Sequence, residues 1–321
     1  MRQSFLKLLH AHTNLFIAGG IVVVGGLMLG SAALMAMAAF RAPAATVAVA
    51  TSTTPAPDAY AHLHLIGEAA IVYDLKTGET LYAQDADQAL PLASITKLIT
   101  MYAATGVLQD RSPVTITPLA LAQSGDVADY GFTEGETFAF KDIARLALVA
   151  SSNTAAEAIA EAAAASKNVG NQQLLASAVT AAGLSDTHAE NGTGLDISTS
   201  QAGAYGTARD VAILAGKLLA KAPDIAGATI APSISVESEQ GIVHTQPNTN
   251  QDVVKVPGIL LSKTGYTDLA GGNLVVVYDA GIAHPVAVVV LGSTQNGRFS
   301  DVQQLISATG AHFAGVAPSD P

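Results

Sequence analysis

The chain has 321 residues, no cysteine and no tryptophan, and its 15 basic and 26 acidic residues give a formal net charge of −11. The missing cysteines exclude a disulfide scaffold, thiol catalysis and thiolate zinc sites. The negative charge and the few aromatic residues argue against a nucleic-acid-binding surface. Half of the residues are hydrophobic, so the chain can bury a sizeable core, and its length predicts one or two domains.

The first apolar segment runs from Leu15 to Phe40 without a charged residue. A membrane-spanning helix needs about 20 apolar residues, whereas the apolar region of a cleavable signal has only about 7 to 15. Arg2 and Lys7 precede the segment. The positive-inside rule therefore predicts a cytoplasmic tail over residues 1–14, a single transmembrane anchor over the apolar segment, and an extracytoplasmic body.

The residues at the end of the apolar segment and just after it bear on how this body is tethered. A cleaved signal peptide is the alternative to the anchor, because small-x-small cleavage sites stand at 36–38 and 48–50. Residues 41–60 are rich in Ala, Thr and Pro and have no apolar period, which predicts a flexible stalk. We expect the folded domain over residues 61–315 and a short tail over 316–321.

Strand patterns stand at both ends of this domain, and helical patterns lie between them. Short apolar runs on either side of the turn 76–79 predict a β-hairpin over 68–83. A helical block follows from about 94 to 220. Its clearest predicted helices are 140–149, 154–165, 171–182 and one capped by Thr207, and the chain closes with strands over 259–262, 273–278 and 285–291 and a helix over 298–313. We therefore predict an α/β (α+β) fold with an inserted helical subdomain and a cleft between sheet and helices.

Three short motifs stand in order along the domain: Ser94-Ile95-Thr96-Lys97, Ser151-Ser152-Asn153 and Lys263-Thr264-Gly265. Each motif alone is weak, because each has a second copy before the apolar segment, in a polar inter-helix stretch or in the hairpin turn. These copies are 4–7, 166–168 and 76–78. The first three stand instead at the start of a helix, after an apolar helix and at the end of an apolar strand, and this context favours them.

The residue types suit nucleophilic catalysis by serine. A serine hydroxyl needs a neighbouring base, and Lys97 shares a helix face with Ser94 because the two are three residues apart. Burial and the charge of Lys263 are expected to lower the pKa of Lys97, so that it is neutral and can act as the base. Ser151 is expected to relay a proton to the leaving amine, and Asn153 to hold a substrate amide or Lys97. The alternative for each residue is an ordinary helix cap, surface lysine or polar turn.

The third motif predicts a binding strand. Lys263 and Thr264 are expected to bind a substrate carboxylate from an edge strand, and Gly265 to let the substrate lie along that strand. The alternative is a plain strand end before a glycine turn. Only the ordered set of three motifs favours the functional interpretation over these alternatives.

With these motifs in order, the chain resembles the D-alanyl-D-alanine carboxypeptidases of the low-molecular-mass penicillin-binding proteins (peptidase S11 type). The resemblance runs from about Ile66 to Phe313 and implies a β-lactamase/transpeptidase-like antiparallel five-stranded sheet flanked by helices, with no metal or other cofactor. Further matching pieces are Thr77-Gly78 with Leu81-Tyr82, Pro91-Leu92-Ala93, Gly135-Glu136, Asn191-Gly192-Thr193-Gly194-Leu195, Thr207-Ala208-Arg209-Asp210, Asn248-Thr249-Asn250, Tyr266-Thr267 and Ala270-Gly271.

The resemblance also implies a reaction. Ser94 would attack the carbonyl of the penultimate D-Ala of a peptidoglycan stem peptide, with Lys97 as base, and water would hydrolyse the acyl-enzyme. The backbone N–H groups of Ser94 and Tyr266 would form the oxyanion hole. Arg298 would help to fix the substrate carboxylate, and a surface arginine at a helix start is its alternative. β-Lactam antibiotics are then expected as covalent inhibitors. Thr154 stands where the family often has Asp.

Other functions fit the same residues. A DD-endopeptidase or a serine β-lactamase would use the same scaffold, although only Glu190 stands near a position suited to a deacylating glutamate. An inert wall-binding protein is the non-enzymatic alternative, against which the complete set of motif residues argues. His62 and His64 are expected to begin a polar strand rather than to bind a metal. The family's second β-domain and C-terminal amphipathic helix have no counterpart in the sequence, so we expect the N-terminal span to be the tether.

Overall fold

The computed structural model describes residues 58–123 and 130–316. The predicted anchor, nearly all of the predicted stalk and most of the predicted tail lie outside these residues. Among the described residues, no helix is long and apolar enough to cross a membrane. Ala59 and Tyr60, which the sequence places at the end of the stalk, are buried, and the Tyr60 hydroxyl donates to Thr309 Oγ1 at 3.1 Å. Packing of the domain therefore extends at least to these two residues.

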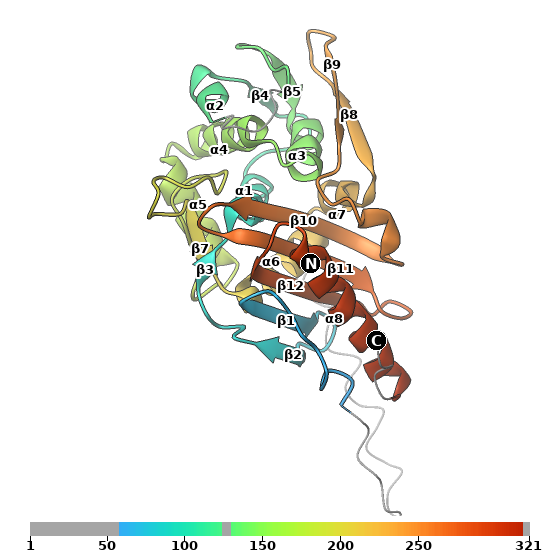
Figure 1. The fold of residues 1–321 in the computed structure, drawn as a ribbon. Helices are drawn as coiled ribbons and strands as arrows, with labels where there is room; N and C mark the ends of the chain where they lie inside the picture. Colours follow the sequence, from blue (N-terminus) through green and yellow to red (C-terminus); the bar gives the residue numbers. More distant parts are fainter. Residues whose placement is uncertain (1–57, 124–129, 317–321) are drawn as a thin grey trace, which may run out of the picture. The chain divides into compact units, whose positions relative to one another are not determined.

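A five-stranded antiparallel sheet forms the centre of the domain (Figure 1). Its spatial order is β10-β11-β12-β1-β2, so two early strands pair with three late ones, as the sequence predicts. The strands are β1 (Ala69–Asp74), β2 (Thr80–Gln84), β10 (Ile259–Thr267), β11 (Gly271–Asp279) and β12 (Pro285–Ser293). Strand β10 lies at one edge, where a peptide can pair with it.

Both faces of the sheet are buried, because alternate residues of a strand point to opposite sides. Val275 and Val277 of β11 belong to the core shared with the helical insert, whereas Val276 belongs to a second core under α8 (Gly297–Ala314). Each buried valine contributes on the order of 1.5–3 kcal/mol. The sheet is thus held between two layers of helix and gives the edge strand a rigid support (Figure 1).

The helical insert lies between β2 and β10 and carries its own short strands. Two of its helices begin at a side-chain cap. Thr207 Oγ1 accepts from the N–H of Asp210 at 3.0 Å, as the sequence predicts, and Ser152 Oγ accepts from the N–H of Ala155 at 3.1 Å. Helix α3 has the predicted bounds. The elements are β3 (Leu90–Pro91), η1 (Ala93–Thr96), α1 (Lys97–Ala104), β4 (Pro113–Thr115), α2 (Pro118–Ala122), β5 (Thr137–Ala139), α3 (Phe140–Val149), α4 (Asn153–Lys167), α5 (Asn171–Ala181), β6 (His188–Ala189), β7 (Ala204–Gly206), α6 (Ala208–Lys221), α7 (Pro223–Ala226), η2 (Gly227–Ile230), β8 (Ser233–Glu237), β9 (Val243–Pro247) and η3 (Val253–Lys255).

Three expectations about strands need correction. Lys263 does not end its strand: β10 continues to Thr267, because the polar side chains of Lys263 and Thr264 find hydrogen-bond partners in the interior. The hairpin β8–β9 lies in a stretch where we predicted no strand. Only Ile234 and Val236 of β8 are buried between exposed neighbours, which is too weak an alternation to distinguish from a loop. The segment around His62 and His64 forms a turn and coil rather than a strand.

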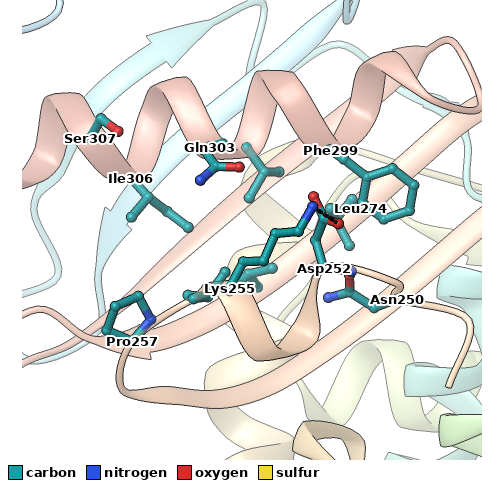
Figure 2. Close-up of a pocket in the computed structure, with 12 residues that line it drawn as sticks. Asn250, Asp252, Lys255, Pro257, Leu274, Phe299, Gln303, Ile306 and Ser307 are labelled. Atoms are coloured by element: carbon teal, nitrogen blue, oxygen red, sulfur yellow. Dashed lines mark hydrogen bonds and ion pairs between the residues drawn. The ribbon is translucent and has the colours of Figure 1, made fainter. Parts of the chain in front are cut away.

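A pocket of about 170 Å³ lies between α8 and the face of β11 (Figure 2). Aliphatic side chains such as Leu274 and Ile306 line it, and the Lys255–Asp252 ion pair, with a separation of 2.7 Å, stands among them. None of the site residues predicted from the motifs lines this pocket. The motif residues lie instead on the other side of the sheet, where the helical insert meets β10.

Candidate active site

The first motif stands at a tight bend between β3 and α1. Ser94 lies in η1, a short 3-10 helix of four residues, and Lys97 is the first residue of α1. Ala93 has a φ of 48°, in the left-handed region that costs a non-glycine residue about 1–3 kcal/mol. A Cβ at Gly194 would lie 1.9 Å from the Ala93 carbonyl oxygen, so only glycine lets the loop after β6 approach this bend. The nucleophile candidate is therefore held in a strained, closely packed turn.

Lys97 is fully buried, and its Nζ contacts three oxygen atoms. Ser94 Oγ and Asn153 Oδ1 are each 2.7 Å away, and the Thr193 carbonyl oxygen is 2.8 Å away. Burial lowers the pKa of Lys97 to about 7. The two carbonyl oxygens can only accept hydrogen bonds. In the neutral amine they bind both N–H groups, and the lone pair then faces the Ser94 hydroxyl.

A second serine–lysine pair is formed by residues far apart in the sequence. Ser151 lies between α3 and α4 with a φ of 59°, and Lys263 Nζ donates to its Oγ at 2.8 Å and to the Thr264 carbonyl oxygen at 2.8 Å. Lys263 is also buried. Burial first, and then the charges of Lys97 and Arg298, lower the pKa of Lys263 well below its ordinary value. Burial is the main cause for both lysines, and the repulsion between their charges opposes protonation of both at once.

The edge strand carries the remaining predicted residues. Thr264 Oγ1 donates to Thr249 Oγ1 at 2.6 Å, and Gly265 packs so closely that a Cβ would lie 2.8 Å from the Leu92 carbonyl oxygen. Tyr266 is exposed beyond them. Arg298 is buried, not a surface residue, and its Nη1 donates to the Gly265 carbonyl oxygen at 2.6 Å. Burial lowers the pKa of Arg298 to about 10.

Hydrogen bonds connect the second motif to both of the others, from Asn153 to Lys97 and from Ser151 to Lys263. Comparison with known proteins then shows the family of this chain. Residues 52–295 match the family model of the D-alanyl-D-alanine carboxypeptidases, Peptidase_S11. This chain belongs to that family. The resemblance seen in the sequence is therefore confirmed, and the motif residues of this S11 domain can be interpreted together.

Two relatives indicate the range of activities within the family. A D-alanyl-D-alanine endopeptidase of Pseudomonas aeruginosa is 31% identical over 275 residues, which cover 81% of this chain and 83% of the relative. The D-alanyl-D-alanine carboxypeptidase DacA of Escherichia coli K12 is 32% identical over 269 residues, which cover 78% of this chain. That alignment covers only 62% of the length of DacA.

Solved structures confirm the fold of the S11 domain. Penicillin-binding protein D2 from Listeria monocytogenes, in its ampicillin-bound form, is 26% identical with a TM-score of 0.65, over 77% of this chain and 98% of that one. The Streptomyces K15 DD-transpeptidase aligns over 78% of this chain and 98% of its own with a TM-score of 0.68. Its sequence identity of 20% supports a likeness of fold alone. The penicillin-binding fold with a five-stranded antiparallel sheet is thus confirmed.

Several supporting residues of the S11 domain were not assigned a role from the sequence. Asn191 Oδ1 accepts from the N–H groups of Thr193 and Gly194 at 3.2 and 2.7 Å, and so orients the carbonyl that contacts Lys97. Asp196 accepts from Thr267 Oγ1 at 3.0 Å and ties the same loop to the end of β10. The polar run Asn191-Gly192-Thr193-Gly194 was the signal available in the sequence, but its hydrogen bonds depend on the fold.

The second copies of two motifs have structural roles. Asp74 Oδ1 accepts from the N–H groups of Lys76 and Thr77 at 2.8 and 3.1 Å in the turn between β1 and β2. Asn168 ends α4 in the left-handed conformation, with a φ of 55°. The copy at 4–7 lies outside the described residues. The copies that their sequence context favours are those whose residues contact one another, through Lys97 to Asn153 and through Lys263 to Ser151.

Proposed function

We propose that this domain is a serine-type D-Ala-D-Ala carboxypeptidase that removes the terminal D-Ala from peptidoglycan stem peptides. The observation that carries the proposal is the position of the Lys97 amine. Two carbonyl oxygens bind its N–H groups, and its remaining direction faces Ser94 Oγ at 2.7 Å. With a pKa of about 7, a large fraction of Lys97 is neutral near neutral pH and can act as a base.

In the acylation step, Ser94 Oγ forms a bond to the carbonyl carbon of the penultimate D-Ala, while Lys97 accepts the hydroxyl proton. The C–N bond to the terminal D-Ala then breaks, and its nitrogen needs a proton. The proton held by Lys97 would pass to Ser151 as the Ser151 hydroxyl, in contact with Lys263, gives its own proton to the leaving amine. In the second step water attacks the ester and gives a proton to Lys97, the bond to Oγ breaks, and Lys97 returns that proton to Ser94.

Binding would use the edge strand. The charge of Lys263 and the hydroxyl of Thr264 suit the carboxylate of the terminal D-Ala, and the substrate backbone would extend the sheet beside Gly265. The N–H groups of Ser94 and Tyr266 would donate to the oxyanion, where losing one donor typically costs about 10²–10³-fold in rate. Asn153 would fix Lys97 and the substrate amide. Arg298 would hold the strand through Gly265 and add positive charge behind the carboxylate.

DD-endopeptidase activity is the second candidate. The Pseudomonas aeruginosa endopeptidase supports it, since the alignment covers 83% of that protein. Both reactions break a peptide bond after D-Ala and differ in the leaving group, so the same serine–lysine pair would serve either. A β-lactamase is less supported, because Glu190 Oε2 accepts from Gln172 on α5 at 2.9 Å.

Mass spectrometry of the intact domain with benzylpenicillin, followed over time, tests the proposal. We expect a persistent single adduct on Ser94, and release of D-Ala from diacetyl-Lys-D-Ala-D-Ala. A transient adduct with consumption of the drug would identify a β-lactamase instead. Cleavage of crosslinked muropeptides without release of D-Ala would identify an endopeptidase. A folded domain that gives neither adduct nor product would leave the inert wall-binding alternative.

We also propose that residues 15–40 anchor the domain outside the cytoplasmic membrane, with the stalk running from 41 to about 58. The uncharged apolar length supports retention of the span. Full-length protein should stay with membranes during alkaline carbonate extraction, and protease added to spheroplasts should degrade the domain. A mature N-terminus just after 36–38 or 48–50 would show that the segment is a cleaved signal instead.

A further inference from the structure

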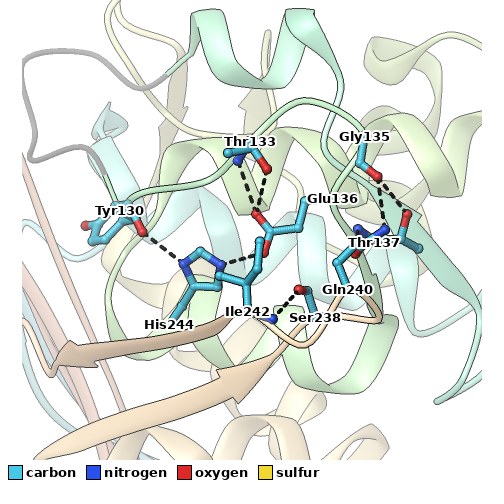
Figure 3. A network of polar contacts seen from close by, with 9 residues as sticks. All are labelled: Tyr130, Thr133, Gly135, Glu136, Thr137, Ser238, Gln240, Ile242 and His244. Atoms are coloured by element: carbon cyan, nitrogen blue, oxygen red, sulfur yellow. Dashed lines mark hydrogen bonds and ion pairs between the residues drawn. The ribbon is translucent and has the colours of Figure 1, made fainter.

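A buried histidine–glutamate pair stands in the helical insert, apart from the three motifs. His244 of β9 and Glu136, just before β5, have exposed side-chain fractions of 4% and 0%, and His244 Nε2 lies 2.6 Å from Glu136 Oε1 (Figure 3). The rings of Phe132 and Phe138 pack against the imidazole with centroid distances of 4.7 and 5.6 Å. The proposed reaction gives this pair no role.

Hydrogen bonds hold both members of the pair in place. Burial alone would raise the pKa of Glu136, but hydrogen bonds from His244, Thr133 and Ser238 outweigh it and lower the pKa. His244 Nδ1 lies 3.0 Å from the carbonyl oxygen of Tyr130. That oxygen only accepts hydrogen bonds, so Nδ1 donates to it. His244 thus binds Glu136 on one side and the Tyr130 backbone on the other (Figure 3).

Tyr130 connects this pair to the second serine–lysine pair. Its hydroxyl donates to the carbonyl oxygen of Ala150 at 2.7 Å. That oxygen belongs to the peptide group that joins Ala150 to Ser151, the residue with the left-handed φ. On the other side, the N–H of Thr249 donates to the Val149 carbonyl oxygen at 3.1 Å. The backbone before Ser151 is thus held by two hydrogen bonds from distant segments.

We propose that Tyr130, His244 and Glu136 form a positioning unit that holds the Ser151 hydroxyl in place opposite Lys263. The inference rests on the proposed function, because Ser151 matters only if it transfers a proton there. A buried ion pair contributes little to stability when compared with well-packed apolar residues. The geometry here instead gives orientation: the buried His244–Glu136 hydrogen bond fixes the Tyr130 backbone, and the Tyr130 hydroxyl fixes the peptide before the left-handed Ser151.

The test is Tyr130→Phe, which keeps the ring and removes only the hydroxyl. We expect the limiting rate constant of acylation by benzylpenicillin to fall about 5- to 10-fold, as for loss of one good hydrogen bond. The dissociation constant of the non-covalent complex and the melting temperature should change little. The matched control is Tyr82→Phe, which removes a tyrosine hydroxyl that donates to Gln84 at 3.1 Å in the hairpin β1–β2.

A double-mutant cycle separates positioning from a general structural effect. In a Ser151→Ala background, Tyr130→Phe should slow acylation no further, because the hydroxyl that it positions is already absent. His244→Gln should slow acylation as Tyr130→Phe does when Ser151 is present, and should slow it no further in the Ser151→Ala background. An equal loss in both backgrounds, or lower stability with an unchanged acylation rate, would overturn the inference.

The same experiment includes wild-type protein and Ser94→Ala. These two samples distinguish failure of the proposed function from failure of the positioning inference. A wild-type domain that forms no adduct would remove the proposed function, and the inference with it. If the wild-type domain is acylated at Ser94 and Tyr130→Phe is acylated with the same rate constant, the proposed function stands and the inference about Tyr130 is wrong.

Discussion

The two serine–lysine pairs of the site are built in opposite ways. Ser94 and Lys97 belong to one turn of backbone, whereas Ser151 and Lys263 come from the helical insert and from the edge strand of the sheet. The first pair is assembled by local helix geometry, and the second depends on correct packing of two separate layers. The contact within the first pair is therefore set by local backbone geometry, and the contact within the second by the fold.

Removal of the nucleophile should have the largest effect. Ser94→Ala should lower D-Ala release by at least about 10⁴-fold and abolish the penicillin adduct, since no second residue can form the ester. Ser166→Ala, in the second copy of the middle motif, is the control and should retain wild-type activity. D-Ala release and intact mass measure both. Substantial carboxypeptidase activity in Ser94→Ala would show that another residue is the nucleophile.

The base should come next. Lys97→Met fills the same buried space without a basic nitrogen, so we expect acylation to slow by about 10²–10⁴-fold, the usual contribution of a positioned base. Stopped-flow measurement with a chromogenic β-lactam gives the rate constant, and circular dichroism checks the fold. If Lys97→Met were acylated within a few-fold of the wild-type rate, the local pair would not be the catalytic one.

Loss of Lys263 should affect substrate binding as well as rate, unlike loss of Lys97. Lys263→Met removes both the carboxylate-binding charge and the partner of Ser151, so we expect D-Ala release to fall by roughly 10²-fold, with part of the loss in KM. Lys76→Met, in the hairpin copy of the motif, is the control and should behave as wild type. A loss confined to kcat, with KM unchanged, would contradict the binding role of Lys263.

The smallest expected effect is that of pH. The neutral fraction of Lys97 increases as pH rises through its pKa of about 7, so the limiting acylation rate constant should rise about 10-fold between pH 6 and pH 8. Measurement at saturating β-lactam excludes changes in binding caused by Lys263. A rate constant that stays flat over this range, or falls, would show that neutral Lys97 is not the base.

What the sequence could predict follows the same division between local and distant contacts. The bounds of α3 were predicted because its apolar residues repeat with the helical period. The contact between Ser94 and Lys97 follows from their spacing. Strand β10 was predicted too short, because buried Lys263 and Thr264 look like surface residues until their partners are known.

Distant partners were out of reach of pattern reasoning. The sequence predicted that burial and a second lysine act together on Lys97, but only the fold brings Lys97 and Lys263 into one buried site. Arg298 could be predicted only from family resemblance, and its bond to the Gly265 carbonyl only from the fold. No spacing rule joins Tyr130 to Ala150, since their contact depends on how the insert folds back onto itself.

The pairing of the first strand with the last has a consequence for biosynthesis. Ala69 of β1 lies opposite Leu291 of β12, so the sheet cannot close until almost the whole domain has been made. Before then β1 and β2 form only a two-stranded hairpin, which is marginally stable in water. Ser94 and Lys97 are synthesised early, yet the strand that carries Lys263 is added late. A truncated chain therefore has the candidate nucleophile without the candidate binding strand, so we expect activity only after synthesis of the domain is nearly complete.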